Sequence, residues 1–279
     1  MNDQTPLISF VILTWNSEST IGDCLDAVSA RCGEESISHE IFVVDNGSCD
    51  GTIGIVERLA GFMPITLERL PKNRGTTIPR NMALKKACGR ILCVLDSDAV
   101  IVGGSLRALV KQLDDDPRVG ILAPKLVFPE GGIQESVRKF PSALGKFGKI
   151  PYIVLRMNFH DTDTYEGFPF TEPAPVDYAI SACWFLRRDI LGTVGYLDEN
   201  IFYAPEDIDY GIRVWAAGMH TLYYPDVVVA HHIQRLTHKK ILSRIALSHF
   251  LGLVYYFRKH RYLRTPAAEN VRQEHPAVK

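Results

Sequence analysis

The sequence predicts an α/β fold in which helices flank a mostly parallel central sheet. Short apolar, β-branched runs alternate with stretches of helical periodicity throughout the first half of the chain. Hydrophobic residues make up 46% of the 279 residues, which is ample for a full core. Because strands that alternate with helices are joined by right-handed crossovers, these observations favour parallel strands with helices packed against them.

Four predicted strands, three of them followed by a predicted helix, account for the first half. The strands are expected over residues 7–14, 40–45, 64–70 and 91–95. Asn16 and Ser17 are placed to cap a helix that runs to about Ala30, and Thr52 opens a second helix after the turn NGSCDG. A third helix is expected between the loop KNRGTT and Gly89.

The second half is less regular. Residues 129–175 are rich in Gly, Pro and aromatic residues, which predicts long loops of the kind that often serve function. A strand is expected over 176–188, a helix with acidic residues in its first turn over 206–218, and a last strand over 220–232. The basic and apolar stretch 239–264 predicts an amphipathic helix.

Composition and charge exclude several classes of protein. The formal net charge of −1 gives no basis for nucleic-acid binding. The start MNDQTPLISF lacks the basic and apolar segments of a signal peptide, and no window holds the roughly 18 apolar residues of a spanning helix. None of the six cysteines forms a C-x-x-C pair, so we expect a reduced, cytoplasmic protein without a zinc site of the usual spacing.

Polar side chains follow three of the predicted strands: Thr14, Asn16, Asp45, Asp96 and Asp98. Ligands of such sheets bind beyond the carboxyl ends of the strands. We therefore expect these side chains to converge on one ligand cleft.

Asp96 and Asp98 directly follow the buried strand ILCVL. A carboxylate is costly to bury unless it is paired or bound to a cation, and Mg²⁺ and Mn²⁺ prefer carboxylate and phosphate oxygens. The alternative is that the two acids cap a helix after Gly103. The convergence of other polar groups on the same edge favours the cation.

Asp45 and His231 each have a structural and a functional interpretation. Asp45 either accepts a hydrogen bond from a nucleobase imide or a ribose hydroxyl, or closes an Asx turn in DNGS, and taken alone the turn is favoured. His231 is either an ordinary polar residue at the end of a strand or a further cation ligand beside D-x-D.

The acidic cluster 206–209 lies at the start of a predicted helix. Acids there stabilise the helix dipole, and Asp209 is spaced to pair with Arg213. For Asp207 the alternative role is that of a general base that accepts a proton from an attacking hydroxyl.

Six motifs follow one another along the chain: VILTWN, VVDNGSCDGT, KNRGTTIPRNMAL, VLDSDAVI, ISACWFLRRDILGTVGYLDENIFYAPEDIDYGIRVWAAG and VVVAHH. In this order they resemble the family 2 glycosyltransferases of GT-A fold, especially the rhamnosyltransferase-like bacterial branch. The resemblance covers roughly residues 7–235, and its most specific part is the long fifth motif. It implies a GT-A nucleotide-sugar-binding domain over 1–235 and a C-terminal basic amphipathic helical tail over 236–279.

The resemblance also implies a role for each candidate residue. Asp207 corresponds to the catalytic base. The residues that correspond to the nucleotide-sugar site are Thr14, Asn16, Asp45, Asn73, Arg80 and Asp96. Those that correspond to the site for Mg²⁺ or Mn²⁺ are Asp96, Asp98 and His231. The chain departs from the branch at 76–78 and 233–235, which bears on sugar specificity.

The implied activity is that of an inverting, metal-dependent hexosyltransferase. It would move a sugar from a UDP- or dTDP-sugar to a hydroxyl of a glycan or lipid-linked glycan in cell-surface polysaccharide synthesis. Two alternatives stay open: a Mg²⁺-dependent haloacid-dehalogenase-like phosphatase with Asp96 as its nucleophile, and a non-catalytic nucleotide-sugar-binding protein. The phosphatase motif normally opens its domain, whereas three strand–helix units precede it here.

The tail has two interpretations as well. Its apolar part, IALSHFLGLVYYF, is too short to span a bilayer, and cations without any acid flank it. It either packs on the domain or in a homodimer, or lies through 239–264 on an anionic membrane. The second interpretation predicts a peripheral protein at the inner face of the cell membrane.

Overall fold

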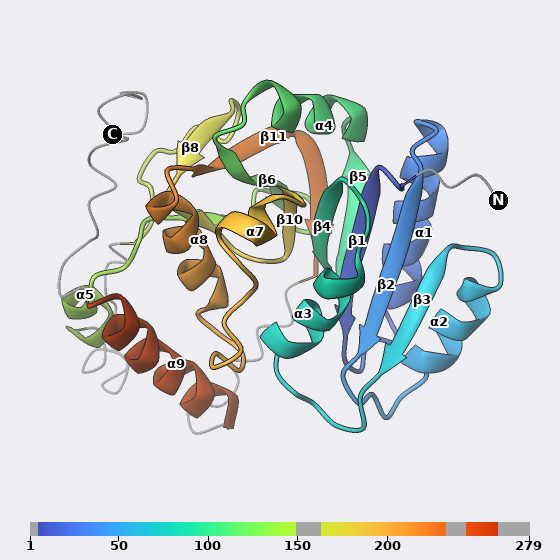
Figure 1. Ribbon diagram of the computed structural model, residues 1–279, viewed down its shortest axis with the longest axis horizontal. Helices are drawn as coiled ribbons and strands as arrows, with labels where there is room; N and C mark the ends of the chain where they lie inside the picture. The colour runs from blue at the N-terminus through green and yellow to red at the C-terminus, as the bar shows by residue number, and fades with distance from the viewer. Residues whose placement is uncertain (1–4, 149–162, 233–243, 262–279) are drawn as a thin grey trace.

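The computed structural model describes residues 5–148, 163–232 and 244–261, and it confirms the predicted α/β fold (Figure 1). Its centre is a sheet of nine strands. In spatial order, the sheet consists of β3 (Ile65–Arg69), β2 (His39–Asp45), β1 (Ile8–Thr14), β4 (Ile91–Asp96), β10 (Cys183–Arg187), β6 (Val119–Val127), β11 (His220–His231) and β5 (Ala99–Gly103), with β8 (Ala174–Val176) paired to β11.

Strand direction divides the sheet into two halves. The strands β3, β2, β1 and β4 are parallel, as the sequence predicts. Beyond β4 the sheet is mixed, because β10 runs antiparallel to both of its neighbours while β11 is parallel to β6. A separate two-stranded pair joins β7 (Val137–Arg138) to β9 (Tyr178–Ala179).

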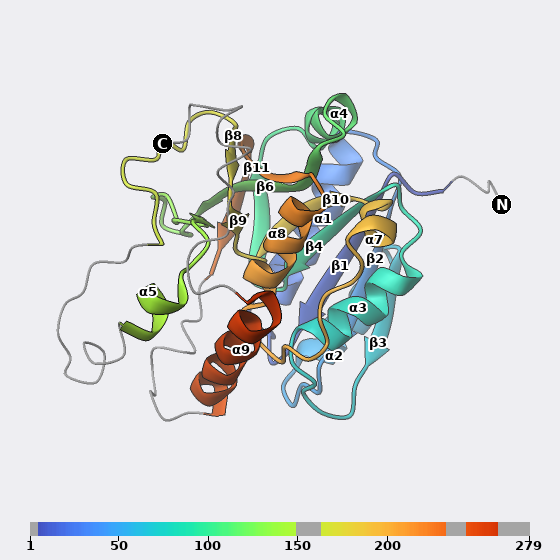
Figure 2. The ribbon, with the colours of Figure 1, turned by 60° about the vertical axis from the view of Figure 1, so that its left-hand side comes forward.

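Helices cover both faces of the sheet (Figures 1 and 2). They are α1 (Ile21–Glu34), α2 (Thr52–Ala60), α3 (Thr77–Lys86), α4 (Leu106–Asp115), α5 (Ala143–Gly148), α7 (Ile190–Thr193), α8 (Glu206–Ala216) and α9 (Arg244–His260). The buried side chains of α1, α2 and α4 belong to one core cluster, and those of α3 and α7 belong to a second cluster on the opposite face. Helix α8 contributes Tyr210 and Val214 to the second cluster and Ile208 and Ile212 to a third one, which it shares with α9.

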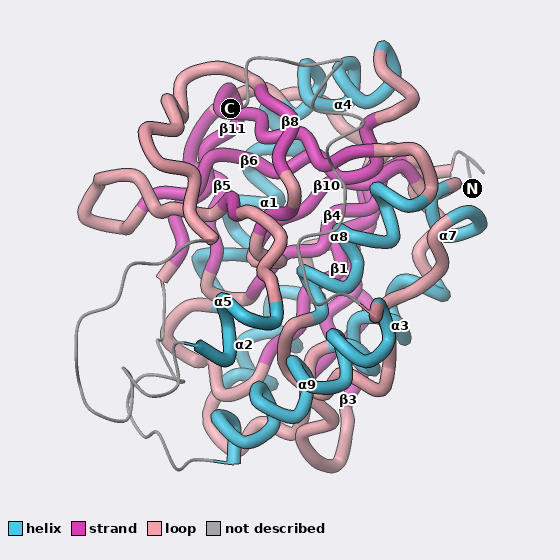
Figure 3. The backbone as a smooth tube through the Cα atoms, turned by 90° about the vertical axis from the view of Figure 1, so that its left-hand side faces the viewer, coloured by secondary structure: helices cyan, strands magenta, loops and turns pink. Residues whose placement is uncertain are grey.

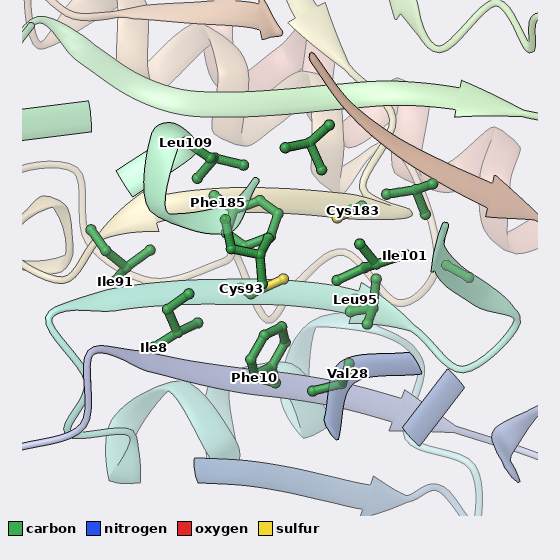
Figure 4. Packing of buried hydrophobic residues seen from close by; sticks show 14 of the residues in the cluster. Ile8, Phe10, Val28, Ile91, Cys93, Leu95, Ile101, Leu109, Cys183 and Phe185 are labelled. Carbon is green, nitrogen blue, oxygen red and sulfur yellow. The ribbon is translucent and has the colours of Figure 1, made fainter. Parts of the chain in front are cut away.

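The strands alternate between the first two clusters. On β1, Phe10 faces the first cluster and Val11 the second, and on β4, Cys93 and Val94 divide in the same way. Figure 4 shows Phe10, Cys93 and Phe185 of three adjacent strands in one layer. Because both faces are covered, the strands appear in the sequence as continuous apolar runs.

Two expectations about helix starts are wrong. Helix α1 begins at Ile21, because Asn16 has a φ of 51° and the chain turns once more before the helix. Helix α4 is capped by Ser105, whose Oγ accepts a hydrogen bond from the amide of Ala108 at 3.1 Å. Strand β5 separates Asp98 from α4, so the carboxylates of the D-x-D motif do not cap that helix.

The expected long loops and the expected tail are only partly described. Within 129–175 the structure contains β7, α5 and β8, and 149–162 lies outside the described residues. Of the tail, α9 packs on the domain through Tyr256 and Phe257, while 233–243 and 262–279 lie outside the described residues. Among the helices that the structure describes, none combines the length and the hydropathy needed to cross a membrane.

Candidate functional site

The carboxyl ends of three parallel strands bring predicted site residues to one edge of the sheet. The register pairs Thr14 of β1 with Asp45 of β2, and Leu13 of β1 with Asp96 of β4. This is the edge at which such sheets bind ligands, and the convergence expected from the sequence is present.

Asp96, Asp98 and His231 form a three-residue group with the geometry of a cation site. Their ligand atoms all lie within 4.8 Å of one another. Pairing of β11 with β5 sets His231 opposite Ala99, which places its Nε2 3.4 Å from Asp98 Oδ1 and 4.0 Å from Asp96 Oδ2. The side-chain amide of Gln134 lies 3.2 Å from Nδ1 of the same ring and so fixes its orientation.

The donor set of this group fits Mg²⁺ or Mn²⁺. Carboxylate oxygens suit both ions, and an imidazole nitrogen is acceptable to Mn²⁺. Burial, followed by the charge of Asp98, raises the pKa of Asp96 despite the neighbouring Arg80. Burial lowers the pKa of His231, but its hydrogen bond to Asp98 and the two carboxylate charges outweigh that effect and raise it. Repulsion between the two carboxylates contributes to the shift of Asp96, and a divalent cation bound between them would relieve that repulsion.

Arg80 lies beside this group with its guanidinium committed to protein acceptors. Its side chain is 2% exposed, and its Nη2 donates to Asp96 Oδ1 at 2.5 Å while Nη1 donates to Glu206 Oε1 at 3.1 Å. Further bonds run to the hydroxyl and carbonyl of Ser181. Arg80 thus holds one oxygen of Asp96 and leaves Oδ2 toward His231. The predicted contact of Arg80 with the nucleotide sugar stays a prediction.

Glu206 is a buried member of the site that the sequence did not assign. Its Oε1 accepts from Arg80 and from Ser181 Oγ, the latter at 2.9 Å. Burial, followed by the charge of Asp207, raises the pKa of Glu206 to about 7. Glu206 and its ion-pair partner Arg80 are 126 positions apart, so no local pattern in the sequence predicts their contact.

Asp207 is the second residue of helix α8 and directly follows Glu206. Its Oδ1 accepts a hydrogen bond from the amide of Ile208 at 2.8 Å. Burial raises the pKa of Asp207, against a smaller opposing effect of that amide and of the Lys146 charge. A carboxylate with a raised pKa is a stronger base, as proton abstraction from a hydroxyl requires.

Asp209 has the structural role expected of it. It is fully buried, and its Oδ2 accepts from Arg213 Nε at 2.9 Å. Two residues of α9 complete the cluster, with Lys259 Nζ at 2.6 Å and His260 Nε2 at 2.8 Å from Asp209 Oδ1. These contacts fasten α9 to the helix that carries Asp207.

Asp45 forms the Asx turn that was one of its two interpretations, and its contact with a nucleobase stays a prediction. It is buried, and its Oδ2 closes an Asx turn by accepting from the amides of Gly47 at 3.1 Å and Ser48 at 3.0 Å. Its Oδ1 and the neighbouring Thr14 Oγ1 are buried without a hydrogen-bond partner in the part of the chain that the structure describes. Buried polar atoms normally have partners, so these two atoms mark a place for a ligand.

The two asparagines predicted for the nucleotide site brace the loops around Asp45. Asn16 Oδ1 accepts from the amide of Cys49 at 2.8 Å, and Asn73 Oδ1 accepts from the amide of Gly75 at 2.9 Å. Asn46, which the sequence did not single out, links Asn73 and Gly75 through its side-chain amide. Contact of Asn16 and Asn73 with a nucleotide stays a prediction.

The chain is similar to proteins of known family. The profile of Glycosyl transferase family 2 matches residues 9–195. N-acetylglucosaminyl-diphospho-decaprenol L-rhamnosyltransferase of Mycobacterium tuberculosis is 27% identical over 241 residues, which cover 79% of this chain and 75% of that protein. O-antigen biosynthesis protein RfbC of Myxococcus xanthus is 26% identical over 82% of this chain and 17% of its own length.

Solved structures show the same fold at lower identity. The GalNAc-T7 structure with UDP, GalNAc and Mn²⁺ has a TM-score of 0.65 at 17% identity, over 92% of this chain and 48% of that chain. Mannosyltransferase PcManGT from Pyrobaculum calidifontis, in complex with GDP-Man and Mn²⁺, has a TM-score of 0.60 at 21% identity, over 95% and 67%. S. aureus TarS 1-349 in complex with UDP has a TM-score of 0.54 at 21% identity, over 79% and 59%.

Proposed function

Because this chain belongs to glycosyl transferase family 2, whose members invert the anomeric carbon, we propose that it uses a UDP- or dTDP-sugar as donor. The acceptor is a hydroxyl of a glycan or lipid-linked glycan in cell-surface polysaccharide synthesis. The names of the relatives support this assignment, since one acts on a diphospho-decaprenol-linked sugar and another serves O-antigen biosynthesis. Family membership removes the phosphatase and the non-catalytic binding protein from consideration.

One observation carries the proposal. The carboxylate–histidine group of Asp96, Asp98 and His231 lies at the sheet edge that also holds the unpartnered Oδ1 of Asp45 and, across Arg80 and Glu206, the base Asp207. A cation site, a base-recognition atom and a general base are the three parts that transfer from a nucleoside diphosphate sugar requires. Asp45 is an acceptor for the imide N–H of uracil or thymine, which favours UDP and dTDP donors.

The chain's own residues then divide the work. Asp96, Asp98 and His231 would hold Mg²⁺ or Mn²⁺, and a cation there supplies charge neutralisation to the diphosphate as the nucleotide leaves. Asp207 accepts the proton of the acceptor hydroxyl, whose oxygen forms the new bond to the anomeric carbon as the bond to the diphosphate oxygen breaks. Arg80 and Glu206 hold Asp96 and the first turn of α8 in fixed relation, so that donor and acceptor meet in one geometry.

We place this reaction in a reducing, cytoplasmic compartment. The six cysteines are all free, and four of them are buried in the core. A chain made for an oxidising compartment would more often use such residues in disulfides.

Thermal stability with nucleotides tests the proposal. We expect UDP or dTDP with Mn²⁺ to raise the melting temperature by about 5 °C at a hundredfold excess over Kd, and GDP or CMP to have little effect. The shift should need Mn²⁺ and vanish in the variant Asp96→Ala/Asp98→Ala, while Asp114→Ala on the exposed side of α4 should keep it. A shift that persists without Mn²⁺, or none with any nucleotide, would contradict the proposal.

A further inference from the structure

Helix α9 carries a second apolar face that is exposed. Leu247, Phe250, Leu251 and Val254 are 59%, 43%, 56% and 41% exposed, and their spacing of three and four residues places them on one side of the helix. Single exposed apolar side chains are ordinary, but a contiguous group marks an interaction surface.

The opposite face of α9 is fixed to the domain, so the exposed group cannot turn inward. Tyr256 and Phe257 are buried in the cluster that contains Ile208 of α8. At Gly252, α9 approaches the loop that precedes α8 so closely that a Cβ would lie 2.0 Å from the carbonyl oxygen of Ala204.

Helix α5 lies beside α9 (Figure 3), and its apolar side chains extend the exposed group into a larger surface. The ring of Phe147 on α5 lies 6.1 Å from that of Phe250 and 5.6 Å from that of Phe257. Leu144, which is 72% exposed, and Phe147 line a cavity of about 520 Å³ between the two helices. We call the exposed side chains of α5 and α9 together the α5–α9 face.

Cations border this face, and the sequence around it contains no acid. Arg258 lies one turn after Val254 on α9, and Arg261 directly follows the end of the helix. Both are exposed and line the same cavity. The sequence has no Asp or Glu in 136–160 or in 236–264, the segments from which the two helices come.

From these contacts we infer that the α5–α9 face docks on a lipid surface with anionic headgroups. Its leucines and phenylalanine enter the boundary of the acyl chains, and its arginines meet the headgroup phosphates. A second copy of the chain fits this face less well, because a two-fold contact would set arginines against arginines without an acid from either helix to neutralise them.

The docked orientation has a consequence for the acceptor. The loop against Gly252 leads directly into α8, and Ala143 of α5 and Ile208 of α8 belong to the same core cluster. A lipid-linked acceptor in the same surface would therefore meet the enzyme on the side of Asp207. This consequence rests on the proposed function, whereas the docking itself does not.

Vesicle co-sedimentation of the full chain tests the docking. We expect binding to phosphatidylcholine vesicles that contain phosphatidylglycerol, with weaker binding at high salt or on phosphatidylcholine alone. Leu247→Ser/Leu251→Ser should reduce binding by more than tenfold. Arg258→Gln/Arg261→Gln should reduce it roughly thirtyfold, at about 1 kcal/mol for each cation. Phe62→Ser, which removes an 86% exposed ring just after α2, is the matched control and should bind as the wild type does.

Three results would overturn the inference. They are no binding of the wild type to anionic vesicles, binding by the leucine variant that equals that of the wild type, or a wild-type dimer in solution that becomes a monomer in the leucine variant. The nucleotide-dependent thermal shift, measured on each variant, shows whether the fold persists. A retained shift with lost vesicle binding supports the docking. A wild type that binds vesicles but shows no nucleotide shift would contradict the proposed function alone.

Discussion

Removing the charge of Arg80 should destabilise the protein far more than a comparable change at the surface. Arg80→Met keeps much of the length of the side chain but leaves Asp96 and the buried Glu206 without their shared cation. Breaking a buried ion pair from one side costs about 3–5 kcal/mol. Because the pKa of Glu206 is already near 7, protonation relieves part of this cost at low pH, and we expect the upper end of the range only above pH 8.

A second substitution should return part of the lost stability. In Arg80→Met/Glu206→Gln the neutral amide still accepts from Ser181 and no longer carries a buried charge. We expect the double variant to recover about 1–3 kcal/mol relative to Arg80→Met. The single variant Glu206→Gln completes the cycle, and the coupling energy is the difference between the double variant's loss and the sum of the two single losses. The control is Arg90→Met, which removes an exposed ion pair with Asp114 and should cost less than about 1 kcal/mol.

Equilibrium unfolding in urea at pH 7 and pH 8.5, without Mn²⁺, measures these differences. The slope with urea must be similar among the variants for the comparison to hold. A coupling energy below about 0.5 kcal/mol, or equal losses in Arg80→Met and Arg90→Met, would refute the reasoning that Arg80 compensates two buried carboxylates.

Three further predictions concern the base, the cation and the fastening of α9. Asp207→Asn should lower the rate of sugar transfer by roughly 10²–10⁴-fold while nucleotide binding persists. In the wild type, the raised pKa of Asp207 should place the acid limb of the pH profile of kcat/KM above the ordinary aspartate pKa of ~3.9. Normal turnover of the variant would remove Asp207 from the mechanism. Gln134→Leu should weaken Mn²⁺ binding roughly tenfold, because the ring of His231 loses the partner of its Nδ1, and unchanged affinity in a Mn²⁺ titration would speak against this role. Asp209→Asn should cost about 2 kcal/mol at pH 7. Its cations lower the pKa of Asp209, so this contribution is present above the ordinary value and disappears as pH falls through the lowered one; a loss that is the same at pH 3 and pH 7 in urea unfolding would contradict it.

Local patterns in the sequence were sufficient for the parallel half of the fold. The strands β1, β2 and β4 contain short apolar runs, the edge strand β3 alternates apolar and polar residues, and strand ends in a parallel sheet meet at one edge. The positions of Thr14, Asp45 and Asp96 therefore followed from the order of elements alone. The strand expected over 176–188 contains β10, but its antiparallel direction did not follow, because strand pairing rather than local pattern sets it. The helices α5 and α7, with 6 and 4 residues, are too short to show helical periodicity.

The residues that hold the site in place could not be predicted from local patterns in the sequence. Arg80 and Glu206 are far apart in sequence, as are Gln134 and His231, which are separated by 97 positions. Each of these residues is ordinary in its own segment and acquires its role only when the sheet brings the two segments together. Asn16 has a left-handed backbone conformation, so α1 begins at Ile21 and not directly after Asn16, as the sequence had suggested.

The ion cluster around Asp209 joins segments that the ribosome makes at different times. Arg213 lies on the same helix as Asp209, but Lys259 and His260 follow Asp209 by 50 and 51 positions. A ribosome making about 5–20 residues per second completes α8 several seconds before it delivers those two side chains. The helix that carries Asp207 is therefore made before Asp209 has all of its partners, and a later segment of the chain supplies the remaining ones. A chain released early would hold every predicted site residue and still lack the fastening of α8.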